Sequence, residues 1–197
     1  LNFAKEIRRL SKPTIIIANK MDLGPAKENY ERLREEFKGS IVIPAASEAE
    51  LALRRAEQKG LIQYIPGEEA FRVLDQAKLT DVQKQALAYV QQRVLSKWIS
   101  TGVQFALNLT VFKLLGMSAV FPVEDAKNLA DKKGNVLPDV FLMPPNSSVK
   151  ALAAEIHSDL AKTILYAVDA RTGVRLPSDY VLRDRDIISI VSAAPRR

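Results

Sequence analysis

Two short runs of branched apolar residues, separated by a charged stretch, constrain the fold of this chain most strongly. Residues 14–18 and 41–43 carry apolar side chains at nearly every position. Such runs are typical of strands buried on both faces, as in parallel sheets covered by helices. The stretch 25–37 between them predicts a helix that ends before Gly39. Strand, helix and strand in this order indicate an open α/β sheet.

A polar turn follows the first run and carries the sharpest functional signal: Asn19, Lys20, Met21 and Asp22. In open α/β sheets, ligands bind beyond the carboxyl ends of the strands, where this turn lies. The carboxylate of Asp22 can accept two parallel hydrogen bonds from the ring N–H and the exocyclic amino group of guanine, whereas adenine has no matching donor pair. The aliphatic part of Lys20 can cover the purine face, and the amide of Asn19 can tie neighbouring loops together. The turn predicts a guanine site.

A simpler interpretation of the same turn is that Asn19 and Asp22 only form the turn and that Asp22 caps the following helix. A second loop, residues 44–47, follows the other run and would open at the same edge of the sheet. The backbone N–H groups of Ala46 and Ser47 are expected to contact the guanine carbonyl oxygen. Small residues after a strand are common, so this loop alone does not decide between the two interpretations.

From residue 48 to 117 the longer strand signals are lost and helical spacing dominates. Three helices are expected: residues 48–59, a helix opened by the Thr80 and Gln83 capping box and extending toward Trp98, and one capped by Ser100 or Thr101 with Val103, Leu107, Val111 and Leu114 on one face. We expect these apolar faces to pack chiefly on one another.

The remaining residues predict a small α+β unit of the ubiquitin-like β-grasp type. Its expected elements are strands at 120–123, 140–143, 164–168 and 187–191, turns at 133–135 and 172–173, and a helix capped by Asn146 and Ser147. The sequence thus divides into three predicted parts: an α/β part of a nucleotide-binding sheet at 1–66, a helical segment at 67–117, and a β-grasp domain at 118–197.

Composition excludes several classes of protein. The chain has no cysteine, so it has neither disulfides nor thiolate metal sites. No apolar run approaches the roughly 20 residues of a membrane-spanning helix, and no signal peptide is recognisable, so we expect a cytoplasmic protein that does not enter membranes. We expect no catalytic residue and no metal ligand. The single histidine, His157, and the single tryptophan, Trp98, are interpreted as structural.

At this point the sequence resembles a known family. Residues Asn19 to Asp22 resemble the guanine-specificity motif of translation-factor-class P-loop GTPases, and the loop at Ala46 and Ser47 resembles their last nucleotide-contacting loop, although the usual order there is Ser-Ala. The C-terminal stretch resembles a TGS domain at Gly134-Asn135, at residues 156–160 and at residues 186–190. The combination is similar to the YchF subgroup of the Obg-related GTPases, in an archaeal-like form.

The resemblance implies GTP or GDP as the ligand, because Lys20 and Asp22 are intact. The printed residues contain no Gly-x-x-x-x-Gly-Lys-Ser/Thr phosphate loop and no switch region. Phosphate contacts supply much of a nucleotide's binding energy. We therefore expect the phosphate-binding half, with its Mg²⁺, to lie upstream of Leu1. The intact parent would be a GTPase, and this chain alone would hydrolyse no nucleotide.

Two other functions stay open beside a nucleotide switch acting on ribosomes or RNA. The helical and β-grasp parts could form a non-enzymatic binding module for RNA, ribosome or protein, or the chain could be an α/β interaction protein with degenerate motifs. The net charge of +6 is spread thinly. Several arginines near the C-terminus could nevertheless face RNA phosphates, with aspartates interleaved: Arg171, Arg175, Arg183, Arg185, Arg196 and Arg197. The sequence does not define an oligomeric state.

Overall fold

The computed structural model describes residues 2–193, which divide into one unit up to Thr110 and a second from Val111. The division falls within η3 (Leu109–Leu114), a π-helical turn that follows helix α6 (Val103–Asn108). The domain boundaries placed at residues 66 and 117 stay predictions. Within residues 2–193, no helix combines the length and the apolar character needed to cross a bilayer.

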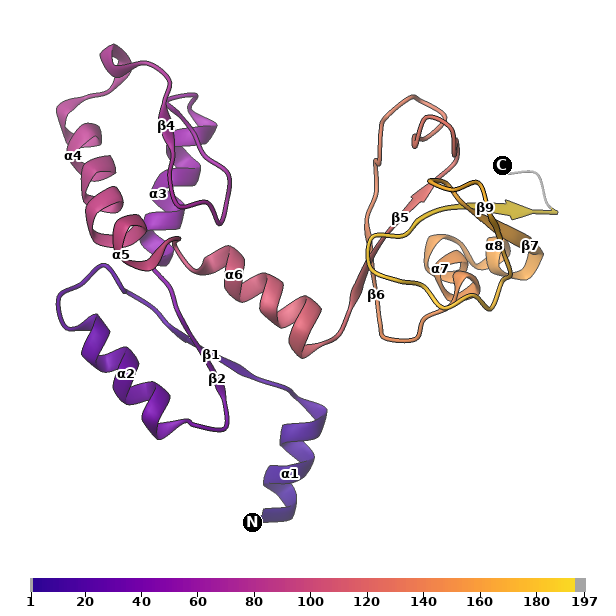
Figure 1. The fold of residues 1–197 in the computed structure, drawn as a ribbon, viewed down its shortest axis with the longest axis horizontal. Coiled ribbons are helices and arrows are strands. Elements are labelled where there is room, and N and C mark those ends of the chain that lie inside the picture. The colour runs from indigo at the N-terminus through magenta and orange to yellow at the C-terminus, as the bar shows by residue number, and fades with distance from the viewer. Residues whose placement is uncertain (1, 194–197) are drawn as a thin grey trace. The chain divides into compact units, whose positions relative to one another are not determined.

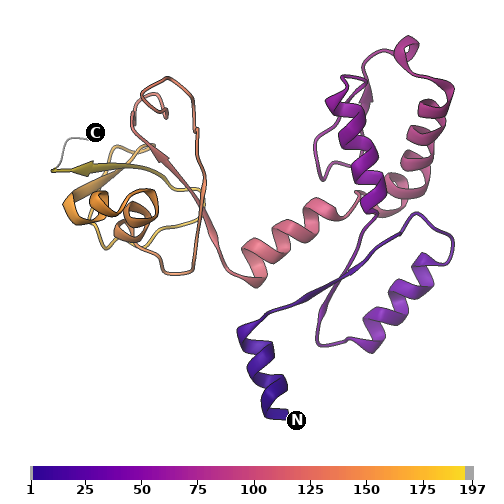
Figure 2. The ribbon, with the colours of Figure 1, turned by 180° about the vertical axis from the view of Figure 1, so that it is seen from behind.

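The first unit is built on two parallel strands. β1 (Ile15–Ala18) pairs with β2 (Ile41–Pro44), and the register sets Ala18 opposite Pro44. Helix α2 (Ala26–Glu36) connects the strands and lies alongside them (Figures 1 and 2). The predicted strand, helix and strand are thus confirmed. Because the two strands end in register at the same edge, the loops that follow them leave the sheet side by side.

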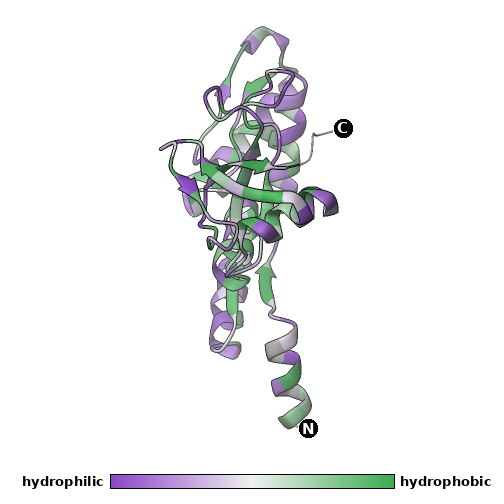
Figure 3. Ribbon diagram, turned by 90° about the vertical axis from the view of Figure 1, so that its right-hand side faces the viewer, coloured by the Kyte–Doolittle hydropathy of each residue, from purple (hydrophilic) through white to green (hydrophobic). Residues whose placement is uncertain are grey.

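Part of this sheet and the helix before it present apolar surface. In α1 (Asn2–Ser11), the side chains of Phe3 and Ile7 are 79% and 49% exposed. Ile17 in the neighbouring strand β1 is also exposed, and the ribbon of this strand is coloured hydrophobic in Figure 3. No described residue buries these three side chains.

A helical layer completes the first unit. Its elements are α3 (Ser47–Gln58), the hairpin β3 (Ile62–Gln63) with β4 (Arg72–Val73), the 3₁₀ turn η1 (Gln76–Lys78), α4 (Asp81–Val90), the π-helical turn η2 (Gln91–Leu95) and α5 (Ser96–Trp98). The Thr80 and Gln83 capping box is confirmed by hydrogen bonds of 3.3 and 2.9 Å. The expectation that the helical faces pack on one another is confirmed for α3 and α4 with η2. The apolar side of α4 and η2 shares a core with Leu53 of α3, and Ile62 of β3 adds a contribution that was not predicted.

The second unit confirms the predicted β-grasp. Its elements are β5 (Ser118–Val123), β6 (Phe141–Met143), α7 (Val149–Ile156), α8 (Ser158–Thr163), β7 (Ile164–Asp169), β8 (Arg175–Leu176) and β9 (Ile187–Ser192). The five-stranded sheet has the order β6-β5-β9-β7-β8. The strands β5 and β9 are parallel at its centre, and the other neighbours are antiparallel.

The helical connection of the β-grasp differs from the prediction in two details. Ser148, rather than Asn146 or Ser147, caps α7 by accepting a hydrogen bond from the Ala151 N–H. Asn146 has a φ of 62°, a left-handed conformation that belongs to the preceding turn instead. The helix also breaks at His157, whose ring nitrogen caps α8 by accepting the Asp159 N–H. The structural role expected for His157 is therefore helix capping.

Candidate nucleotide-binding site

The two loops that follow β1 and β2 are joined by hydrogen bonds. The N–H of Ala45 donates to the Ala18 carbonyl at 2.9 Å, and the N–H of Met21 donates to the Ala45 carbonyl at 3.1 Å. The side-chain oxygen of Asn19 accepts the Ser47 N–H at 3.0 Å. Asn19 thus ties neighbouring loops together, as its position in the sequence predicted, and the loops form one edge of the sheet.

The conformation of the first loop presents Lys20 and Asp22 differently. Lys20 has an exposed side chain and a φ of 66°. This positive φ strains the backbone of a residue with a Cβ and costs about 1–3 kcal/mol. Asp22 is partly buried, yet none of residues 2–193 donates a hydrogen bond to its carboxylate. Helix α2 begins after Pro25 without a side-chain cap, so the interpretation of Asp22 as a helix cap is wrong.

The backbone N–H groups of the second loop are already engaged. That of Ala46 donates to the Thr101 carbonyl at 2.8 Å, and that of Ser47 donates to Asn19. We expected both to contact a guanine carbonyl oxygen. In this structure they instead connect the loop to its protein neighbours. The first-turn N–H groups of α3, which have no partners within the helix, lie just beyond this loop and provide further donors.

Two aromatic side chains from the helical layer hold the first loop, and sequence reasoning missed both contacts. The indole N–H of Trp98 donates to the Met21 carbonyl at 3.2 Å, and the hydroxyl of Tyr89 donates to the Asp22 carbonyl at 3.2 Å. Trp98 also packs edge-on against Tyr30. The core role predicted for Trp98 is confirmed by its packing with Ala18, whereas its polar contact joins residues too distant in sequence for periodicity to reveal.

A close backbone approach holds the second loop. Gly102 has a φ of 79°, and a Cβ there would lie 2.0 Å from the Pro44 carbonyl oxygen and 3.0 Å from the Ala45 Cα. Only glycine fits this position, because it has no Cβ and adopts positive φ without strain. The absence of a side chain at Gly102 lets the neighbouring Thr101 carbonyl reach the Ala46 N–H. Ser100 or Thr101 was predicted to cap α6. Gly102 occupies the cap position instead, and no side chain caps this helix.

A partly buried carboxylate, that of Glu50, anchors Thr101 against α3. Oε2 of Glu50 accepts hydrogen bonds from the Thr101 hydroxyl at 2.6 Å and from the Tyr64 hydroxyl at 2.8 Å. Thr101 is 1% exposed and Tyr64 is 4% exposed. Two neutral donors on one carboxylate oxygen satisfy its charge away from water, which makes this arrangement more rigid than a surface contact.

This arrangement predicts a specific pH dependence of stability. Burial and the hydrogen bond to Glu50 raise the pKa of Tyr64 from 10.0 to about 12. Because the folded pKa lies above the unfolded one, the stabilisation is complete below pH 10 and is lost as the pH rises from 10 to about 12. Urea unfolding across this window should show a steeper loss of stability in the wild type than in Tyr64→Phe. Parallel profiles for the two proteins would contradict the assignment.

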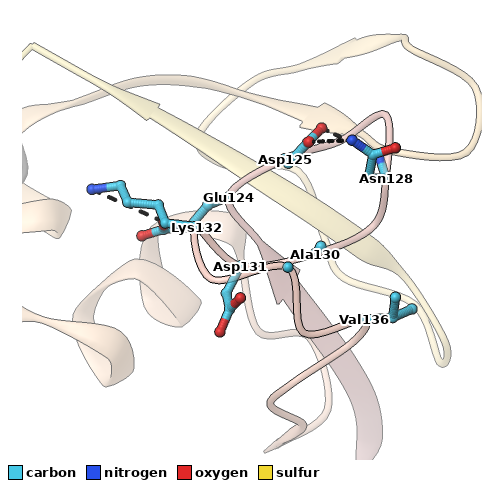
Figure 4. A pocket seen from close by; sticks show the side chains of 8 residues that line it. Glu124, Asp125, Asn128, Ala130, Asp131, Lys132 and Val136 are labelled. Atoms are coloured by element: carbon cyan, nitrogen blue, oxygen red, sulfur yellow. Dashed lines mark hydrogen bonds and ion pairs between the residues drawn. The ribbon is translucent and has the colours of Figure 1, made fainter.

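The second unit has a separate shallow depression of about 490 Å³ in the loop after β5 (Figure 4). Three carboxylates line it, those of Glu124, Asp125 and Asp131, and the two aspartates are held by their own turns. Each aspartate accepts backbone N–H groups of its own turn and the side-chain amide of a nearby asparagine, Asn128 or Asn135. These hydrogen bonds, chiefly those from the asparagine side chains, lower the pKa of both carboxyls. The carboxylates thus stabilise the loop. No metal-binding group of three or more His, Asp or Glu side chains occurs within residues 2–193.

The fold and the two joined loops define a class of protein: an α/β nucleotide-loop unit followed by a β-grasp domain. Comparison with known families agrees. The family described as Obg-like GTPase YGR210-like, G4 motif-containing domain, matches residues 17–125, and the TGS domain family matches residues 130–192. The chain therefore belongs to the YGR210-like group of the Obg-like GTPases. The predicted resemblance to Obg-related GTPases with a TGS domain is confirmed.

Three similar proteins match between 60% and 98% of this chain. An uncharacterized GTP-binding protein of Methanocaldococcus jannaschii is 46% identical over 194 residues, which are 98% of this chain and 49% of that protein. A crystal structure of a GTP binding protein from Pyrococcus horikoshii is 43% identical, with a TM-score of 0.72 over 97% of this chain and 49% of the other. An uncharacterized GTP-binding protein of Schizosaccharomyces pombe is 30% identical over 125 residues, covering 60% of this chain and 30% of its own. The chain thus spans half or less of the length of these relatives.

Proposed function

We propose that this chain supplies the guanine-recognising part of a GTP-binding protein. One observation carries the proposal: Asp22 presents a partly buried carboxylate without a donor from the described residues, at the ligand-binding edge of a parallel strand pair. A carboxylate in such a place is expected to have a ligand, because leaving it without donors costs free energy. The names of the relatives as GTP-binding proteins support the same conclusion.

Each residue of the proposed site has a distinct task. Asp22 accepts the ring N–H and the amino group of guanine, and the stem of Lys20 covers one face of the base. Asn19 keeps the loops together through its bond to Ser47. Ala46 and Ser47 set the backbone boundary of the pocket. The amino end of α3 provides the positive end of a helix dipole toward the guanine carbonyl oxygen.

The nucleotide's phosphates require residues that this sequence does not contain. GTP and GDP are the proposed ligands, and Mg²⁺ would bind with the phosphate groups and residues of a phosphate loop. The printed residues have no such loop. Hydrolysis by this chain alone is therefore not expected, while a polypeptide that combines it with a phosphate loop would be a GTPase.

A titration of the isotope-labelled chain tests base recognition directly. Because the base contributes only part of the binding energy, GDP should bind with a dissociation constant on the order of 1 mM. Amide resonances of Met21, Asp22 and Ser47 should shift with GDP and shift far less with ADP at the same concentration. Equal responses to the two nucleotides would contradict the proposal. Micromolar GTP binding in calorimetry would contradict the expectation that this chain binds weakly because it makes no phosphate contacts.

The β-grasp unit favours a second task, contact with ribosome or RNA. The guanidinium of Arg175 stacks 4.5 Å above the Tyr166 ring. The interleaved aspartates accept backbone N–H groups: Asp169 from Arg171, Asp184 from Ala119, and Asp186 from Arg183. Asp184 also forms an ion pair of 3.6 Å with Arg185. The guanidinium groups of Arg171 and Arg183 are thus not drawn into these contacts. Arg196 and Arg197 lie outside the described residues. With such a partner, we propose that the protein acts in the cytoplasm. If the chain did not recognise a nucleotide, binding of ribosome or RNA would be its only function.

A further inference from the structure

We infer that Tyr89, Trp98 and Thr101, which lie outside both nucleotide loops, are positioning residues that set the affinity and selectivity for guanine. This inference rests on the proposed function and extends it to the helical layer. The three residues are not expected to touch the base. They act through the backbone of the residues that would.

The first argument concerns the direction in which Asp22 points. Its Cα lies between two peptide planes, one bearing the Met21 carbonyl and the other bearing its own carbonyl. Trp98 donates to the first and Tyr89 donates to the second, both at 3.2 Å. Peptide planes are rigid, so the two torsions at Cα are the only soft ones. Holding both planes fixes the direction of the Asp22 Cα–Cβ bond, which limits its carboxylate to the positions that the side-chain rotamers allow from there.

The second argument concerns the opposite loop. The Thr101 carbonyl accepts the Ala46 N–H at 2.8 Å, and its hydroxyl is held by Glu50 at 2.6 Å. Glu50 belongs to α3, whose amino end follows the loop directly. Thr101 therefore connects the loop, the helix and the turn before α6 into one piece. Without the hydroxyl bond, the turn would lose its connection to α3 and would be held to the loop only by the Ala46 N–H bond and the close approach of Gly102.

Both loops are thus held by one short segment, residues 89–102, and the spacing between Asp22 and Ala46 depends on it. The carboxylate of Asp22 comes from one loop and the wall at Ala46 from the other. The Asp22 carboxylate can accept hydrogen bonds from both donors of guanine only if it keeps its distance from the wall at Ala46. Small misplacements of a reacting or binding group are costly, since hydrogen bonds weaken steeply with distorted geometry.

The test compares three conservative variants with two matched controls. Trp98→Phe keeps an aromatic ring and removes the N–H, Tyr89→Phe removes only the hydroxyl, and Thr101→Val keeps the shape. Tyr30→Phe controls for altered aromatic packing beside Trp98. Thr110→Val controls for loss of a hydroxyl, because Thr110 donates only within its own helix, to Ala106.

The measured quantities are the dissociation constants of GDP and of IDP, which lacks the exocyclic amino group, from amide shifts of the full 197-residue chain. We expect each of the three variants to bind GDP roughly fivefold or more weakly and to lose part of the preference for GDP over IDP. The controls should match the wild type. All titrations are run at a temperature at which each variant is folded.

The outcomes separate this inference from the function on which it rests. If the wild type prefers GDP while all three variants match the controls in both constants, the helical layer has only a structural role and the inference is overturned. A lower unfolding free energy with an unchanged ratio of the two constants leads to the same conclusion. If the wild type itself shows no preference for guanine, the proposed function fails, and the inference fails with it.

Discussion

Asp22→Asn is expected to convert a preference for GDP into a preference for xanthosine diphosphate. Xanthine carries a carbonyl where guanine has its amino group, so a side chain that donates a hydrogen bond is needed in place of a carboxylate. Each hydrogen bond from guanine to the charged Asp22 is worth about 1.5–3 kcal/mol. The loss of even one should weaken GDP binding by at least about tenfold, and a matching gain is expected for xanthosine diphosphate.

The same amide titration measures this change in the two nucleotides. Asp139→Asn is the matched control, because it makes the same substitution at an exposed position of the second unit. If the ratio of the two dissociation constants were the same in Asp22→Asn as in the wild type, Asp22 would not read the base. A function as a plain binding module would then be favoured, since RNA or ribosome binding should not respond to this substitution.

Gly102→Ala is expected to destabilise the first unit by roughly 2–4 kcal/mol. Part of this cost comes from the positive φ of 79°, which a residue with a Cβ adopts at a penalty. The rest comes from the Cβ itself, which would lie 2.0 Å from the Pro44 carbonyl oxygen, so that the backbone must move apart. The Thr101 carbonyl would then lose the Ala46 N–H. Denaturant unfolding followed by the fluorescence of Trp98, the single tryptophan, reports on this unit.

Gly60→Ala separates the two contributions. Gly60 has a φ of 66° and no atom within 4 Å of a Cβ built there, so its substitution carries the strain without the contact. We expect a cost of about 1 kcal/mol. Equal shifts of the two unfolding midpoints would show that the close approach at Gly102 contributes nothing.

The βαβ part and the β-grasp were predictable because their signals are local. The consecutive apolar positions of β1 and β2 indicated buried parallel strands, and the turn after β1 pointed to the edge where ligands bind. The capping box of Thr80 and Gln83 was also predictable from the sequence, since both of its hydrogen bonds join residues three apart. A role of Asn19 in tying the two loops together was predicted because the loops after neighbouring parallel strands meet, but its partner, the Ser47 N–H, was not.

The supports of the site were not predictable because they are long-range and made largely by the backbone. Every residue has a backbone carbonyl, so the sequence does not mark those of Met21 and Asp22 as acceptors. Their donors, Trp98 and Tyr89, also lie far along the chain. Amphipathic spacing showed that α4 has an apolar face that packs on other helices, but not that a two-residue hairpin helps α3 to cover it. Strands of two residues are too short to display alternation.

The central pairing of β5 with β9 also bears on how the second unit is made. Phe121 is opposite Ile187, so the strand that begins the sheet has its parallel neighbour among the last residues of the described chain. A ribosome delivering the chain from its amino end releases β5 long before β9, and until then β5 has an unsatisfied edge. Closure of such a distant pair is slow. In a nascent chain, this edge of β5 therefore has no partner before β9 has been synthesised as far as Ser192.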